Sequence, residues 1–60
     1  MTISNILKKA GDKKIVLNYS GSLAEFENST EAEFEFEQYD ILDEEAKYHI
    51  TKTTLFIEVK

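Results

Sequence analysis

The sequence contains no cysteine and no proline, and it has only two glycines and one histidine. Without cysteine the chain can form no disulfide and has no thiol nucleophile, and a single histidine cannot build a structural zinc site. No glycine-rich phosphate loop is present. We therefore predict no metal site, no cofactor and no catalytic residue.

Paired carboxylates are plentiful, and acid–base catalysis would need one of them buried in a pocket. Such pockets measure roughly 300 Å³ or more, and a monomer of 60 residues can barely enclose one. We accordingly predict that the protein is not an enzyme.

A chain of 60 residues makes one domain, predicted to span residues 1–60. A folded chain of this size buries only about 60% of the surface that its unfolded form exposes. Small domains compensate with disulfides, metals or partner subunits. Because the first two are excluded, we expect the protein to be a homo-oligomer.

Long apolar runs are also missing. Residues 1–10 contain few apolar side chains and are followed by Lys13 and Lys14, which fits neither a signal peptide nor a membrane-spanning segment. These features predict a cytoplasmic protein without a membrane partner.

Negative charge dominates the chain and is concentrated in one segment. The net charge is −5, and ten of the twelve acidic residues lie between Glu25 and Glu45, a stretch without any lysine or arginine. Such a surface repels nucleic acid and anionic membrane, so the predicted partner is a protein with a basic surface. The predicted partner-binding residues are Glu25, Glu27, Glu31, Glu33, Glu35, Glu37, Asp40, Asp43, Glu44 and Glu45.

Glutamates alternate strictly with apolar residues from Glu31 to Glu37. This period of two predicts a strand with Ala32, Phe34 and Phe36 on one face and a row of carboxylates on the other. The carboxylates of such a row would be about 6.8 Å apart. DNA carries one phosphate per about 3.4 Å of each strand, so nucleic-acid mimicry, our alternative hypothesis, would need a second line of charge.

The flanking segments predict the other elements. Residues 1–11 are predicted to form a short helix that docks through an apolar face. Residues 13–19 are predicted to be a strand, with residues 23–27 continuing it past a glycine bulge or leading to the next strand. Residues 28–30 have turn chemistry, which makes the segments 13–27 and 31–37 an antiparallel pair.

The last third of the chain predicts a helix and a strand. Residues 38–48 have apolar residues at helical spacing with Asp40 as a suitable N-cap, and residues 53–59 return to strand chemistry. Residues 47–51 could instead be a strand paired with 53–59.

These elements predict an α+β fold, with a small antiparallel sheet covered by one or two short helices. The helix at 1–11 would precede a β-β-α-β core over residues 13–59. The predicted core residues are Ile15, Leu17, Phe34, Phe36, Ile41, Leu42, Leu55 and Ile57.

Three pieces of the sequence, Glu31 to Phe36, Ile41-Leu42 and Ile57-Glu58-Val59, resemble the YonK-like proteins of Bacillus prophages. The resemblance covers about residues 13–59. It implies a compact, oligomeric accessory protein associated with phage and located in the cytoplasm of a bacterium or infected host cell. It implies no catalytic residues.

Overall fold

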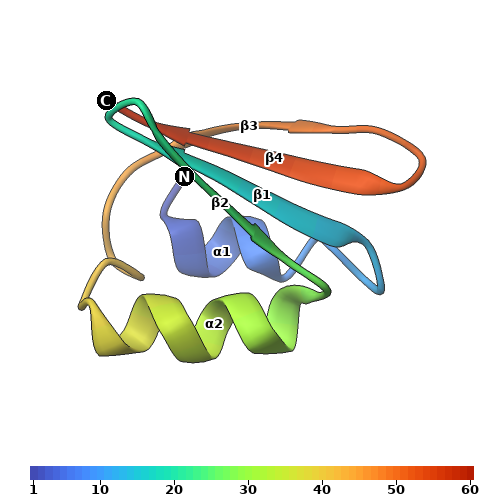
Figure 1. Ribbon diagram of the computed structural model, residues 1–60, viewed down its shortest axis with the longest axis horizontal. Coiled ribbons are helices and arrows are strands. Elements are labelled where there is room, and N and C mark those ends of the chain that lie inside the picture. Colours follow the sequence, from blue (N-terminus) through green and yellow to red (C-terminus); the bar gives the residue numbers. More distant parts are fainter.

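Apolar side chains on alternate positions of two strands form the centre of the fold. The computed structural model describes residues 1–60, and its sheet has the strand order β2-β1-β4-β3 (Figure 1). Both helices lie on the same face of this sheet. The elements in chain order are α1 (Ile3–Leu7), β1 (Lys14–Tyr19), β2 (Ser22–Phe26), α2 (Ser29–Gln38), β3 (Lys47–Ile50) and β4 (Thr54–Val59).

The predicted α+β class is confirmed, and the sheet is mixed. The outer pairs, β1 with β2 and β3 with β4, are antiparallel hairpins, whereas the central strands β1 and β4 are parallel. A parallel pair needs a long crossover connection, and here the crossover consists of β2, α2 and β3. The predicted sheet missed this central pair because it counted residues 31–37 as one of its strands, whereas this segment is helix α2 and belongs to the crossover.

The core lies between the sheet and the two helices. The predicted docking face of the N-terminal helix is buried against the sheet, and α2 contributes two residues. Ile41 and Leu42 are partly buried against the core. The eleven buried residues are Ile3, Ile6, Leu7, Ala10, Ile15, Leu17, Ala32, Phe36, Leu55, Ile57 and Val59.

The predicted strand at 31–37 is wrong, because this segment is helix α2. Alternation of acidic and apolar residues repeats every two positions and therefore also every four, so it places Ala32 and Phe36 on one face of a helix. Both are buried, whereas Phe34 is 65% exposed and is not a core residue. Glutamate and alanine favour helices, and no β-branched residue follows Thr30 in the segment.

Capping interactions define both ends of α2. The Asn28 side chain accepts a hydrogen bond of 3.0 Å from the backbone N–H of Glu31, as an N-cap does. At the other end Asp40 has a φ of +58°. The N–H of Asp40 donates to the carbonyl of Glu37, and the N–H of Ile41 donates to that of Phe36. This pair of bonds is a Schellman motif, which ends the helix.

The predicted helix at 38–48 is also wrong. Asp40 follows the C-cap of α2 and is not an N-cap, and β3 occupies residues 47–50, as the alternative hypothesis predicted. The segment between α2 and β3 is hydrogen-bonded to the N-terminus of α1 instead. The N–H groups of Ile3 and Ser4 donate to the carbonyls of Glu44 and Leu42, both at 2.9 Å, so this segment satisfies donors that every helix leaves free at its N-terminus.

The predicted strand at 13–19 is confirmed as β1, and the residues after its turn form the next strand, β2, in a hairpin with it. Ser20 and Gly21 form its two-residue turn with φ values of +52° and +95°, and Tyr19 pairs with Ser22. Two positive φ values identify a type I′ turn, whose twist matches that of the two strands in a hairpin. The turn at 28–30, predicted to link two strands, instead begins α2.

We predict that Asp40→Gly stabilises the protein. Glycine adopts a positive φ without the steric cost of a side chain, and the change removes an anion from a helix C-terminus. The free energy of unfolding should rise by about 1 kcal/mol, which for a domain of this size raises Tm by about 4–8 °C. Thermal unfolding followed by circular dichroism measures the shift. Asp43→Gly removes the same charge from a position without a positive φ and should not stabilise; equal gains in both variants would contradict the helix end described here.

Candidate functional site

The solvent-facing side of α2 combines acidic residues with an exposed aromatic ring. Successive residues of a helix are 100° apart, so Phe34 lies opposite the buried pair Ala32 and Phe36. Glu31 and Glu35, four residues apart, lie on one flank of Phe34. Glu33 and Glu37 share the other flank. We name Phe34 and these four glutamates the α2 acidic face.

Beside Phe34 the surface is hollowed. The hollow has a volume of about 390 Å³ and is lined by Phe26, Thr30, Glu31, Phe34 and Glu35. Phe26 comes from the edge strand β2, and its ring makes an edge-to-face contact with buried Phe36 at a centroid distance of 5.2 Å. The hollow thus has aromatic walls fixed to the core and carboxylates at its rim.

The structure does not bring the ten predicted partner-binding residues together. Glu31, Glu33, Glu35 and Glu37 share α2, but they form two flanks and not the predicted single row. Glu27 follows β2, and Asp40 and Asp43 lie in the segment after α2. Glu25, Glu44 and Glu45 each contact a group elsewhere in the chain.

Two of these contacts are ion pairs. Glu25 projects from the sheet face opposite the helices and pairs with Lys14 at 2.6 Å. The hydrogen bond from Lys14 to Glu25, together with the charge of that carboxylate, raises the pKa of the lysine above its ordinary value. The Glu45 carboxylate lies 3.1 Å from the N-terminal amine of Met1. These carboxylates are therefore partly neutralised within the chain.

The third contact is a hydrogen bond between a phenol and a carboxylate. The Tyr19 hydroxyl at the end of β1 donates to Glu44 Oε2 at 2.5 Å. This hydrogen bond, followed by burial and the carboxylate charge, raises the pKa of Tyr19 above its ordinary value. It ties the segment after α2 to the sheet.

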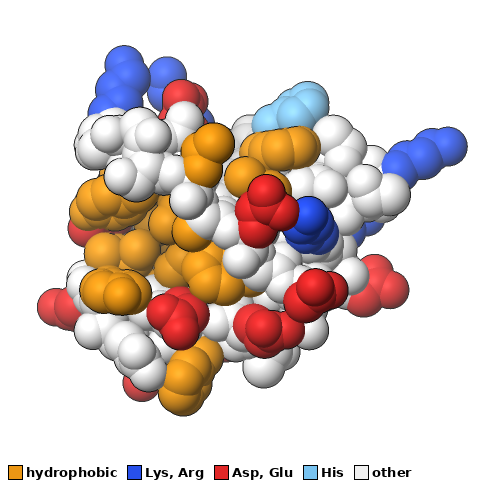
Figure 2. Space-filling model, viewed as in Figure 1, with side chains coloured by type: hydrophobic (Ala, Val, Ile, Leu, Met, Phe, Trp, Pro, Cys, Tyr) orange, Lys and Arg blue, Asp and Glu red, His pale blue; other side chains and the backbone are white.

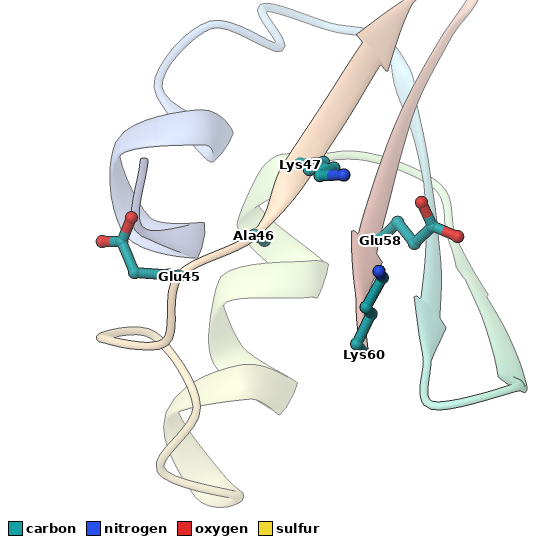
Figure 3. Close-up of a pocket in the computed structure, with 5 residues that line it drawn as sticks. All are labelled: Glu45, Ala46, Lys47, Glu58 and Lys60. Atoms are coloured by element: carbon teal, nitrogen blue, oxygen red, sulfur yellow. The ribbon is translucent and has the colours of Figure 1, made fainter.

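Two further hollows have other characters. One of about 360 Å³ is lined by Glu45, Ala46, Lys47, Glu58 and Lys60. Figure 3 shows that the Glu45 side chain points away from the other charged side chains, so these groups do not converge on one point. The other hollow, of about 460 Å³, has a mainly apolar lining, and Figure 2 shows hydrophobic side chains gathered in one region between the sheet and α2. It is lined by Leu17, Tyr19, Ser22, Tyr39 and Ile41.

The structure contains no group of three or more His, Cys, Asp or Glu side chains placed to hold a metal ion. His49 lies on β3 with its ring centroid 6.2 Å from that of Phe56. None of the helices has the length and apolar character needed to span a membrane.

Comparison with protein-family models, with curated proteins and with solved structures gives no match. The resemblance to YonK-like prophage proteins stays a prediction.

Sequence reasoning missed the exposed apolar side chains. Phe34 is predicted as a core residue and Leu23 has no predicted role, yet both are exposed. One signal could have corrected the first error. Asn28 and Glu31 have the spacing of an N-cap and its third helical residue, which indicates a helix start directly before the alternating segment.

We predict that stability declines at alkaline pH, in part through Tyr19. The pKa values of Tyr19 and Lys14 are both raised in the folded state. Their contributions are therefore complete below about pH 10 and are lost as the pH rises through the folded-state pKa values. Tyr19→Phe should lower the free energy of unfolding at pH 7 and make the decline above pH 10 shallower.

Urea unfolding from pH 7 to 11 measures this effect. Tyr39→Phe is the matched control, because the Tyr39 ring is exposed and its hydroxyl makes no hydrogen bond with the protein. If both variants followed the same pH profile, the bond between Tyr19 and Glu44 would not contribute to stability.

Proposed function

We propose that the protein is a non-enzymatic interaction module that binds a basic protein through the α2 acidic face. The observation that carries this proposal is the position of Phe34, which is 65% exposed and flanked on both sides by glutamates. An exposed phenylalanine leaves a large apolar area in contact with water, and burying it against a partner is favourable.

The chemistry of this face suits lysine or arginine side chains. Both have apolar stems that can cover an aromatic ring and cationic ends that can reach carboxylates. Arginine also stacks on aromatic rings. The hollow between Phe26 and Phe34 would take a stem, while Glu31 and Glu35 at its rim would bind the charged end.

Nucleic-acid mimicry is the second candidate, and it is favoured by the two flanks of charge on α2. Each flank places its two carboxylates about 6 Å apart along the helix, so each has roughly half the charge density of a DNA strand. A phenylalanine between the two lines has no counterpart in a phosphate backbone. Basic, partly apolar protein surfaces therefore fit this face better than the groove of a nucleic-acid-binding enzyme.

The resemblance to YonK-like proteins adds the hypothesis that the module is a phage accessory protein in the bacterial cytoplasm. Under this hypothesis its basic partner is a host protein. A bacterial lysate is then the appropriate source in which to search for that partner.

The proposal predicts that removing the charge of three α2 glutamates reduces the amount of partner protein captured. The immobilised protein and a Glu33→Gln, Glu35→Gln, Glu37→Gln variant would be exposed to bacterial lysate, and captured proteins would be quantified by mass spectrometry. Three exposed ion pairs of about 0.5 kcal/mol each give about 1.5 kcal/mol, so capture should fall roughly tenfold. Glu31 is kept because it lies in the first turn of α2.

Two further variants sharpen the experiment. Phe34→Ser should also reduce capture, because it removes the apolar contact and leaves every charge in place. Glu58→Gln is the matched control, since Glu58 is an exposed acid on β4, away from α2. If the triple variant captured the same basic proteins as the unaltered chain, the proposal would be overturned. Displacement of a captured protein by an oligonucleotide, with strong dependence on salt, would support mimicry instead.

A further inference from the structure

The second face of the sheet is covered by no other element. Both helices lie on the opposite face, as Figure 1 shows. Because side chains alternate along a strand, the residues between the buried ones project from this open face. We name it the open sheet face, and its residues are Lys14, Val16, Asn18, Leu23, Glu25, Lys47, His49, Thr54, Phe56 and Glu58.

An apolar band crosses the open sheet face. Val16 on β1 and Phe56 on β4 are direct neighbours in the register of the central pair, and the His49 ring lies against Phe56. Leu23 extends the band onto β2 and is 71% exposed, while Phe56 is 41% exposed. These residues line a shallow hollow of about 350 Å³. Figure 2 shows the histidine of the chain at this surface beside hydrophobic side chains.

The charges of this face balance, unlike those of the chain as a whole. Lys14 and Lys47 stand against Glu25 and Glu58, so the strands contribute no net charge to the open sheet face. The whole chain has a net charge of −5, and the acidic residues of α2 lie on the other side of the molecule. A second copy, which carries the same net charge, meets the least repulsion if it approaches this face.

We propose that the open sheet face is the interface of a homodimer in which two sheets pack face to face. The two-fold axis runs parallel to the strands and between β1 and β4, so that β1 of one copy covers β4 of the other. Sheet-on-sheet packing of this kind keeps the strand directions within about 30° of each other.

The strand register determines which side chains meet in this arrangement. Val16 of one copy faces Phe56 of the second copy, and the reverse contact repeats across the axis, as a two-fold interface requires. Glu25 on β2 likewise faces His49 of the second copy. The arrangement thus packs the Val16 and Phe56 side chains of the two copies together and sets a carboxylate against an imidazole ring.

The size of the face determines the strength of the dimer. Four strands of four to six residues, at about 3.3 Å per residue and about 4.8 Å between strands, cover roughly 330 Å². Standard protein interfaces bury about 800 Å² per partner. We therefore expect a dimer that dissociates on dilution, and measurements must span a wide range of concentration.

This inference is independent of the proposed function, because α2 takes no part in the interface. Loss of partner capture in the α2 variants leaves the dimer unaffected, and a monomeric protein could still bind a basic partner through α2. Failure of one proposal is therefore distinguishable from failure of the other.

Sedimentation equilibrium from about 5 µM to about 1 mM tests the dimer. The unaltered chain should change from monomer to dimer across this range. Leu23→Ser with Phe56→Thr should shift the midpoint at least tenfold upward, and both sites are exposed, so the fold should persist. Phe34→Ser is the control, because it removes an exposed apolar side chain from the helix side of the molecule. A chain that stays monomeric to 1 mM, or a midpoint that moves with Phe34 and not with Leu23 and Phe56, overturns the proposal.

The natural lack of cysteine permits a second measurement of the register. A Val16→Cys chain mixed with a Phe56→Cys chain should form a disulfide-linked heterodimer under mild oxidation in preference to either homodimer. Asn18→Lys should tighten the dimer, because Glu58 of the second copy faces this position. Preferential linkage within either single variant, or a weaker Asn18→Lys dimer, contradicts the proposed two-fold axis.

Discussion

β1 and β4 pair over six residues at the centre of the sheet, and every other element is placed relative to them. Each strand directs alternate aliphatic side chains toward the helices, and these side chains form the floor of the core. The hairpin partners β2 and β3 attach at the two outer edges. Since the two central strands come from opposite ends of the sequence, their pairing also brings α1 beside the segment that follows α2.

Covering only one face of the sheet gives the molecule two chemically different sides. Helix α2 presents carboxylates and a single exposed ring, whereas the uncovered strands present balanced charges around a narrow apolar band. Small domains cannot bury all of their apolar side chains, and the exposed ones are therefore informative when they gather in one place. In this protein Leu23 and Phe56 gather on the open sheet face, and Phe34 is exposed on the helix side.

Much of the fold could be predicted from the sequence, and the largest error has a clear physical origin. The docking face of α1, the buried residues of β1 and the closing strand β4 follow from local patterns. The alternating segment did not, because a repeat of two positions satisfies both a strand and the four-residue spacing of a helix. Asn28 and Asp40 resolve the ambiguity, since their capping roles are possible only in a helix. The candidate site changed accordingly from a row of carboxylates to a helix face with Phe34 at its centre.

The parallel central pair also has a kinetic consequence. Paired residues such as Lys14 and Thr54 lie 40 positions apart in the sequence, so their contact requires closure of a long loop, whereas both hairpins close locally. The hairpins should consequently form early, and the middle of the sheet should be completed last. Until then one edge of β1 and one edge of β4 remain without hydrogen-bond partners, and at high concentration a hairpin of another molecule could occupy either edge, giving a domain-swapped product during refolding.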